Sequence, residues 1–176
     1  MTSATSTGLL ELLELIERAD ERGLAAAGLA CLDRCLPLLA PEGADALRPV
    51  WAAVARGDGG AWGEAVGTAR AELAATGTGG DEAAGLVRGM LDTAPAEWAG
   101  APLREWAGRC SDTALAVHGR YDAAEGGPLY AGELRRQQAV LESAAHGPTG
   151  LRRARELSAE GGRVLRAVVS RRARTA

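Results

Sequence analysis

The segment from Pro102 to Asp122, PLREWAGRCSDTALAVHGRYD, has the longest clean amphipathic pattern in the chain. At about 100° per residue, its apolar side chains fall on one narrow helical stripe, and Asp112 lies opposite. His118 lies at the edge of this stripe, about 60° from Leu103 by the same geometry. The segment therefore predicts a core helix with a titratable side chain at its border. The stripe consists of Leu103, Trp106, Ala107, Cys110, Ala114, Val117 and Tyr121.

The composition favours helices along the rest of the chain as well. The 176 residues include 38 alanines and 23 leucines but no phenylalanine. Alanine is the best helix former and a poor strand former. No stretch shows the period-two alternation of a strand bounded by turns. A core of such small side chains requires closely packed helices, in which the four tryptophans should supply a large share of the apolar burial.

Glycine, proline and capping residues divide the chain into eight expected helices. We expect residues 1–7 to form a disordered N-terminal tail ending in a Ser6/Thr7 cap, and residues 8–176 to form a single domain. The predicted fold class is all-α: a single-domain bundle of seven or eight helices arranged as successive antiparallel hairpins, with the 102–122 helix at its centre. The expected helices cover residues 8–22, 24–39, 44–56, 61–76, 81–93, 102–122, 129–146 and 151–174.

A repeat-like arrangement is an alternative to this bundle. The expected hairpins begin near residues 8, 44 and 81, at intervals of 36 and 37 residues, which suit helical-hairpin repeats. In the unit at 44–76, Gly60, Trp62 and Ala65 match part of the tetratricopeptide pattern, but the first helix of the unit does not. An irregular bundle is therefore the preferred interpretation.

The residue usage also indicates a source and a compartment. All 20 basic residues are arginine, and the chain has neither lysine nor asparagine. Because lysine and asparagine have AT-rich codons, this usage indicates a high-GC bacterium, such as an actinobacterium. The N-terminus lacks the pattern of a signal peptide, no run is long enough for a membrane span, and three cysteines do not form a disulfide framework. We therefore expect a cytoplasmic protein without membrane association.

The sequence offers no convincing metal or catalytic set. Cys31, Cys35, Cys110 and His118 could form a zinc site if their helices faced each other, but structural zinc ligands usually come from short knuckles rather than from mid-helix positions. The paired Glu-x-x-His motifs of di-iron bundles are missing. The glycine-rich GDGG and GTGG stretches lack a preceding strand and read as helix connectors. Ser111 has no histidine at a suitable neighbouring helical position. We therefore expect no cofactor, no metal and no enzymatic activity.

A candidate polar cluster involves Gln137, which falls in the middle of the apolar stripe of the 129–146 helix. A buried amide without a hydrogen bond costs about 1–3 kcal/mol, so Gln137 requires partners. His118, Tyr121 and Tyr130 are the candidates if the 102–122 and 129–146 helices pack together. The cluster is interpreted either as a structural device that fixes helix register or as the lining of a small-molecule pocket.

The charge is strongly polarised along the chain. Residues 1–149 contain 12 arginines and 21 acidic residues, whereas residues 150–176 contain eight arginines and two acidic residues. On the 151–174 helix, Arg152, Arg155, Arg163 and Arg166 form one stripe opposite an apolar face. Such a stripe is a solvated face, a complement to the acidic first helix, or a surface for a partner. Glu156 and Glu160 and the net charge of −3 weigh against nucleic acid.

The leading functional hypothesis is a non-enzymatic protein-interaction or scaffold module with an unidentified protein partner, a homodimer being one option. The first alternative is a small-molecule-binding helical domain with a pocket near His118 and Gln137. The second alternative is a nucleic-acid-associated protein that uses the arginine-rich C-terminal helix. The pair Gly161-Gly162 in that helix is expected to be either a close-packing contact or a hinge.

Overall fold

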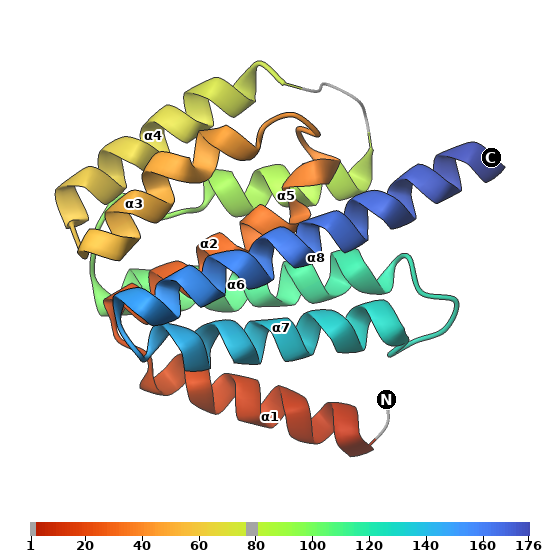
Figure 1. Cartoon of the computed structure of the whole chain (residues 1–176), viewed down its shortest axis with the longest axis horizontal. Coiled ribbons are helices and arrows are strands. Elements are labelled where there is room, and N and C mark those ends of the chain that lie inside the picture. Colours follow the sequence, from red (N-terminus) through yellow and green to blue (C-terminus); the bar gives the residue numbers. More distant parts are fainter. Residues whose placement is uncertain (1–2, 77–80) are drawn as a thin grey trace.

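The computed structural model describes residues 3–76 and 81–176, which form eight α-helices and two short 3₁₀ helices without strands (Figure 1). The all-α prediction is therefore confirmed for the described residues. The GTGG connection at 77–80 lies outside them. The helices are α1 Ser3–Arg18, α2 Glu21–Cys35, η1 Leu36–Leu38, η2 Ala44–Leu47, α3 Arg48–Arg56, α4 Gly59–Ala74, α5 Glu82–Asp92, α6 Gly100–Gly119, α7 Pro128–Ala144 and α8 Pro148–Thr175.

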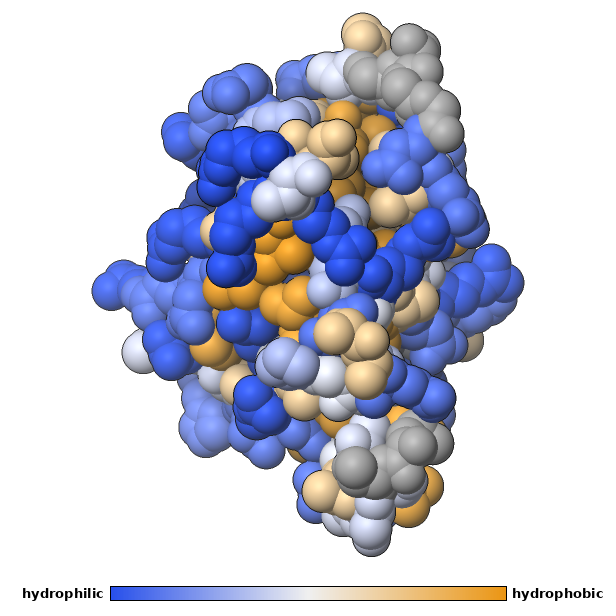
Figure 2. All heavy atoms as spheres, turned by 90° about the vertical axis from the view of Figure 1, so that its right-hand side faces the viewer, coloured by the Kyte–Doolittle hydropathy of each residue, from blue (hydrophilic) through white to orange (hydrophobic). Residues whose placement is uncertain are grey.

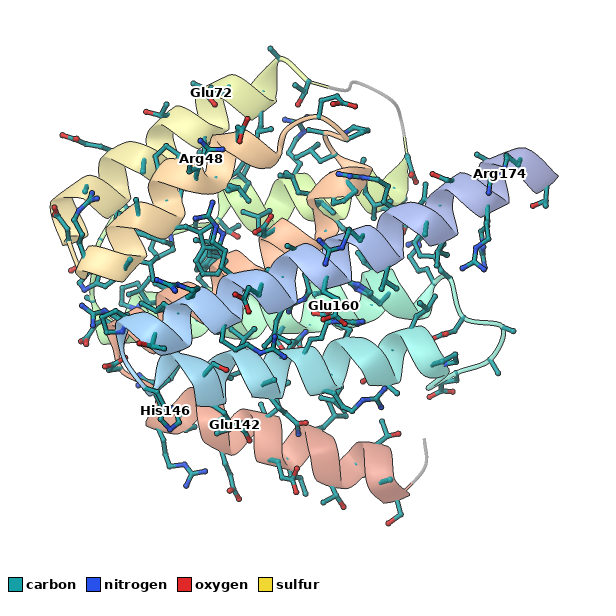
Figure 3. The ribbon with its side chains drawn as sticks, in the orientation of Figure 1. Arg48, Glu72, Glu142, His146, Glu160 and Arg174 are labelled. Carbon is teal, nitrogen blue, oxygen red and sulfur yellow. The ribbon has the colours of Figure 1, made fainter. Side chains whose placement is uncertain are left out.

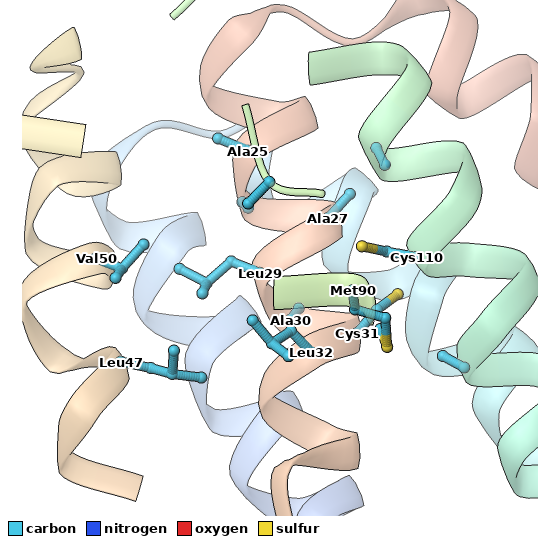
Figure 4. Packing of buried hydrophobic residues seen from close by; sticks show 14 of the residues in the cluster. Ala25, Ala27, Leu29, Ala30, Cys31, Leu32, Leu47, Val50, Met90 and Cys110 are labelled. Atoms are coloured by element: carbon cyan, nitrogen blue, oxygen red, sulfur yellow. The ribbon is translucent and has the colours of Figure 1, made fainter. Parts of the chain in front are cut away.

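Helix α2 occupies the centre of the molecule. Twelve of its 15 residues are buried, and it packs against α6, α7, α8 and α3. Figure 4 shows its side chains from Ala25 to Leu32 meeting Val50, Met90 and Cys110 of surrounding helices. Between Leu24 and Leu32 the helix has no polar side chain, and a helix that is apolar all round is buried all round. The expectation that the 102–122 helix is central is corrected accordingly: α6 packs against the central helix α2.

The contacts between helices distinguish a bundle from a solenoid. The consecutive pairs α3–α4, α5–α6 and α7–α8 pack together. Helix α1, however, packs mainly on α7, and α2 contacts helices more than 60 residues further along the chain. In a solenoid each repeat contacts only its neighbours in sequence. The chain is therefore a compact bundle and not a repeat array.

Three aspartates determine where helices begin. Asp20 Oδ1 accepts a hydrogen bond from Gly23 N at 2.8 Å, Asp58 Oδ1 accepts one from Ala61 N at 3.0 Å, and Asp81 Oδ1 accepts one from Ala83 N at 3.1 Å. Each satisfies an amide that the first helical turn leaves without a partner. Because Asp20 caps α2, the first helix ends at Arg18 rather than at the expected residue 22.

Helix α1 begins at Ser3, five residues before the expected start. Ser6 and Thr7 therefore lie inside the helix instead of capping it. The Thr7 hydroxyl donates to Ser3 O at 3.1 Å, and the Thr5 side chain is buried. Residues 3–7, which were expected in the tail, thus extend α1. Residues 1–2 lie outside the described residues.

Several glycines allow helices to approach closely. A Cβ at Gly28 of α2 would lie 2.5 Å from the ring of Trp106 on α6, and a Cβ at Gly161 of α8 would collide with the aliphatic part of Arg34. Helix α8 runs without interruption through Gly161-Gly162. Of the two expected roles for this pair, the structure shows close packing.

Replacing Gly28 with alanine should destabilise the protein although alanine is the better helix former. The added methyl group must displace the Trp106 ring, and overpacking of this kind costs about 1–3 kcal/mol. The matched control is Gly67→Ala on α4, where a Cβ meets nothing within 4 Å and should stabilise the helix by about 0.5–1 kcal/mol. Urea unfolding of both variants gives the two free energies. Equal stabilisation by both would contradict the tight contact between α2 and α6.

The surface is predominantly hydrophilic on the side that contains the C-terminal end of α8. Figure 2 shows hydrophilic residues surrounding smaller hydrophobic areas on this face. Within residues 3–76 and 81–176, none of the helices combines the length and the apolar character that crossing a membrane requires.

Candidate functional site

A buried cluster of polar side chains lies between α2, α6 and α7. Its centre is an ion pair between Arg34 of α2 and Glu133 of α7, in which both side chains are 0% exposed. Arg34 Nε donates to Glu133 Oε2 at 2.8 Å, and Arg34 Nη2 donates to Glu133 Oε1 at 2.7 Å. This two-pronged geometry is the strongest pairing available to a guanidinium and a carboxylate. The ion pair and the side chains around it, Cys31, Ser111, His118 and Gln137, are called the Arg34–Glu133 cluster below.

Gln137 connects this ion pair to α6. Its Nε2 donates to Glu133 Oε1 at 2.9 Å and to the Ser111 carbonyl oxygen at 3.3 Å. Its Oε1 accepts a hydrogen bond from Ser111 Oγ at 2.5 Å. Both polar atoms of the buried Gln137 amide, the nitrogen and the oxygen, are therefore hydrogen-bonded. This confirms that Gln137 is buried and hydrogen-bonded, as its place in the apolar stripe predicts.

His118 and Cys31 are held in their neutral forms. Burial lowers the pKa of His118, and this effect outweighs the nearby Glu133 carboxylate, which raises it. With Nδ1 2.8 Å from the Ala114 carbonyl oxygen, the ring carries its proton on Nδ1. Its Nε2 lies 3.6 Å from Glu133 Oε2. Arg34 Nη2 donates to Cys31 Sγ at 3.4 Å, but burial still raises the pKa of this thiol to about 12.

Glu133 remains ionised in this environment. Burial raises its pKa, but the charge and hydrogen bonds of the Arg34 guanidinium, together with the hydrogen bond from Gln137, lower it, and the net pKa lies below the usual value. The carboxylate thus neutralises Arg34 inside the bundle. Each side chain of the cluster is buried against protein, and two of its nitrogen atoms, Arg34 Nη1 and His118 Nε2, are buried without a hydrogen-bond partner among the described residues.

The structure brings together two of the four residues expected in this cluster. His118 and Gln137 both contact Glu133, whereas Tyr121 and Tyr130 are half-buried and, among the described residues, form no hydrogen bond with it. The Tyr121 ring lies 5.1 Å below the guanidinium of Arg172. This arrangement supports the interpretation of a structural device over that of a pocket lining.

Sequence reasoning missed Arg34 and Glu133. Glu133 precedes Gln137 by four residues and therefore shares its helix face. Arg34 lies on the same helix as the apolar run from Leu24 to Leu32, which has no polar face that could point to solvent. Together these two patterns could have indicated a buried charge pair. The other histidine, His146, is exposed just after α7, with Nδ1 2.8 Å from the Glu142 carbonyl oxygen (Figure 3).

The arginine stripe of α8 borders an open groove of about 380 Å³. Its walls are formed by α8, by the end of α2 and by the segment from η1 to η2. Arg155, Arg163 and Arg166 line the groove, whereas Arg152 is exposed elsewhere on the helix. We call this feature the arginine groove. Its apolar lining comprises Leu36, Pro37, Ala40 and Ala159.

Two aspartates also line the groove, but both already have partners. Asp33 Oδ2 accepts a hydrogen bond from Trp51 Nε1 at 3.0 Å, and burial raises the pKa of Asp33. Asp45 forms an exposed ion pair with Arg48 at 2.8 Å. Glu160, which Figure 3 labels on α8, lies 3.9 Å from Arg136 of α7. The Arg155 guanidinium also acts on Asp33, where its charge lowers the pKa, but burial outweighs this effect.

The groove arginines retain capacity for binding. Arg166 Nη2 donates to the Pro41 carbonyl oxygen at 3.1 Å. Within the described residues, Arg155 and Arg163 form neither a hydrogen bond nor an ion pair at contact distance. Each guanidinium has five donors, so most donors in the groove face solvent.

Metal ligands do not come together in the part of the chain that the structure describes. Within it, no three or more His, Cys, Asp or Glu side chains are placed to hold an ion. Cys31, Cys35 and Cys110 are buried as free thiols. The GDGG stretch connects two helices: Gly57, at φ +63°, ends α3, and Asp58 caps α4.

Comparison of the chain with protein-family models, with curated proteins and with solved structures finds no match.

Proposed function

We propose that this protein is a non-enzymatic interaction module that binds an acidic, amphipathic segment of a protein partner in the arginine groove. The observation that carries the proposal is the combination of three arginines and an apolar floor in one groove of about 380 Å³. Guanidinium groups pair with carboxylates, and the floor between them suits apolar side chains. A helix that presents both kinds of residue would use the helix-in-groove mode of recognition.

A nucleic acid fits the same surface less well than an acidic protein. Asp33 and Asp45 line the groove, and Glu156 and Glu160 lie on the same helix as its arginines. A phosphate backbone requires a more continuous basic track, and the chain as a whole has a net charge of −3. A short segment with a few carboxylates brings fewer negative charges near Asp33 and Asp45 than a phosphate backbone does.

The composition supports a place for this interaction in the cytoplasm of a high-GC bacterium. Buried free thiols are typical of proteins from reducing compartments. The exclusive use of arginine as basic residue agrees with a GC-rich genome.

Charge reversal in the groove should weaken partner binding strongly. The test variant carries Arg155→Glu, Arg163→Glu and Arg166→Glu, which replace the pairing groups by repelling ones. We expect the dissociation constant of a partner isolated with the wild-type protein to rise about tenfold or more. The measurement is isothermal titration or surface plasmon resonance with that purified partner, with circular dichroism confirming intact helices.

A control with the same change in net charge is available on the same helix. It carries Arg152→Glu, Arg171→Glu and Arg174→Glu, all exposed and outside the groove lining. This control should bind the partner almost as well as the wild type does. Equal loss in both variants would show a general charge effect and overturn the groove assignment, as would a partner that proves to be DNA or RNA.

A further inference from the structure

The outer face of α1 carries the most exposed large apolar side chains that the described residues contain. Leu10 is 63% exposed and Leu13 is 58% exposed. Together with the exposed Glu14 and Glu17 they fall within a sector of about 100° around the helix. The opposite face of α1, with Leu12 and Ile16, is buried towards α7. Helix α1 is therefore apolar on two faces, of which one has no cover within the described chain.

The acidic residues on this face are available for further pairing. Glu14 lies 3.9 Å from Arg18 and Glu17 lies 3.9 Å from Arg104, and both glutamate side chains are more than 70% exposed. Exposed pairs at this distance contribute little stability. Both carboxylates can thus accept hydrogen bonds from another molecule at small cost.

This face and the arginine groove are complementary in charge and in polarity. Two leucines and two glutamates form one surface, and an apolar floor with arginines at its rim forms the other. The glutamates are three residues apart on α1, and Arg163 and Arg166 are three residues apart on α8, so one helical turn separates the charges on both sides. The opposite net charges of residues 1–149 and 150–176 agree with this complementarity, because α1 lies in the acidic part of the chain and the groove arginines lie in the basic part.

We propose that the occupant of the arginine groove is the outer face of α1 from a second copy of this chain. Leu10 and Leu13 lie on the apolar floor, and Glu14 and Glu17 pair with Arg163 and Arg166. The inference rests on the proposed function, because it names the partner of the same groove. Helix α1 keeps its own contact with α7, so that no rearrangement of the bundle is needed.

The contact joins two different surfaces and is therefore heterologous. Figure 1 shows α7 between α1 and α8 within one copy. A helix that stays packed on α7 does not reach the groove of its own chain. Each copy instead offers one α1 face and one groove, and association is between molecules and depends on concentration.

The test measures the mass of the full-length protein by sedimentation velocity over a range of concentrations. We expect the apparent mass to rise above 18.1 kDa with concentration and to return towards it at about 1 M salt, where the screening length falls to about 3 Å. An acidic-face variant, Glu14→Arg with Glu17→Arg, and a groove variant, Arg163→Glu with Arg166→Glu, should each raise the dissociation constant about tenfold or more.

Mixing the two variants gives the decisive result. Each variant alone brings like charges together, but the reversed α1 of one variant complements the reversed groove of the other. The mixture should therefore associate again. Arg171→Glu with Arg174→Glu is the matched control outside the groove and should associate like the wild type. Leu10→Ser with Leu13→Ser should weaken association without any change of charge.

Three outcomes would overturn the inference: a wild type that stays at 18.1 kDa at every concentration, association that persists in both charge variants, or a mixture that fails to associate. None of these results by itself removes the proposed function, which is tested separately by the binding of another protein partner to the groove variant and to its control. Circular dichroism of every variant confirms that a loss of association is not a loss of fold.

Discussion

Replacing Glu133 with alanine should lower the free energy of unfolding by about 3–5 kcal/mol. The substitution leaves the Arg34 guanidinium charged and 0% exposed without its counter-ion. It also removes one of the two acceptors of the Gln137 amide nitrogen. Removal of one partner of a buried pair costs much more than the pair itself contributes, because the remaining charge has lost its solvent. Urea unfolding followed by far-UV circular dichroism gives the difference directly.

A double variant separates the unpaired charge from the loss of packing. Arg34→Met with Glu133→Leu removes both charges and keeps similar volume, so we expect it to recover most of the stability lost in Glu133→Ala. Gly161, which packs against the aliphatic part of Arg34, leaves room for the methionine chain. A decrease of less than about 1 kcal/mol in the free energy of unfolding of Glu133→Ala would be typical of an exposed ion pair and would contradict the complete burial of this one.

The pH dependence of the Glu133→Ala effect provides a second measurement. The pKa of Glu133 in the folded chain lies below its usual value, since the charge of Arg34 and the hydrogen bonds from Arg34 and Gln137 together outweigh burial. The stabilisation is therefore complete above the unfolded pKa of about 4.3 and is lost as the pH falls through the lower folded pKa. The difference between wild type and variant should shrink in acid.

Local signals predicted the helices, and their limits explain the errors in the bounds. Asp81 and the connection at 57–60 lie where capping and glycine rules place them. The end of the first helix was misplaced because Gly23 resembles a C-terminal glycine, whereas Asp20 captures the Gly23 amide and starts α2. Competing caps only a few residues apart cannot be ranked by propensity alone.

The central position of α2 depends on contacts that periodicity does not encode. A polar face shows which side of a helix meets solvent, and the run from Leu24 to Leu32 has none. The pattern of the 102–122 segment was clearer because one of its faces is exposed. Clear amphipathicity therefore pointed to a helix next to the centre, and the fully buried helix was recognisable only by the lack of a pattern.

The sequence also predicted only part of the polar cluster around Gln137 and of the arginine groove. The burial of Gln137 and its proximity to Glu133 follow from their own helix, but the partner Ser111 requires knowledge of how α6 and α7 meet. The arginine stripe was evident from spacing on α8. Its division into groove arginines and the outlying Arg152 was not, because the other wall of the groove comes from the segment after α2.

Replacing Trp62 with alanine should cost about 3–5 kcal/mol, the range for a fully buried aromatic side chain. Trp62 of α4 is 0% exposed and forms edge-to-face contacts with Trp98 at 5.7 Å and with Trp106 at 5.6 Å between ring centroids. Its Nε1 donates to the Pro95 carbonyl oxygen at 2.8 Å. The alanine variant loses both ring contacts, leaves a cavity and removes the hydrogen-bond donor of the Pro95 carbonyl oxygen. Thermal unfolding together with near-UV circular dichroism records the effect.

Trp98→Ala is the matched control, because Trp98 contacts the same ring but is only partly buried and lies in the turn before α6. It should cost clearly less than Trp62→Ala while removing one of the two edge-to-face pairs. In a core composed largely of alanine and leucine, neighbouring side chains are too short to fill the space that an indole leaves. A Trp62→Ala protein as stable as Trp98→Ala would contradict the view that this tryptophan joins α4 to α6. That result would leave the small side chains between the helices as the source of cohesion.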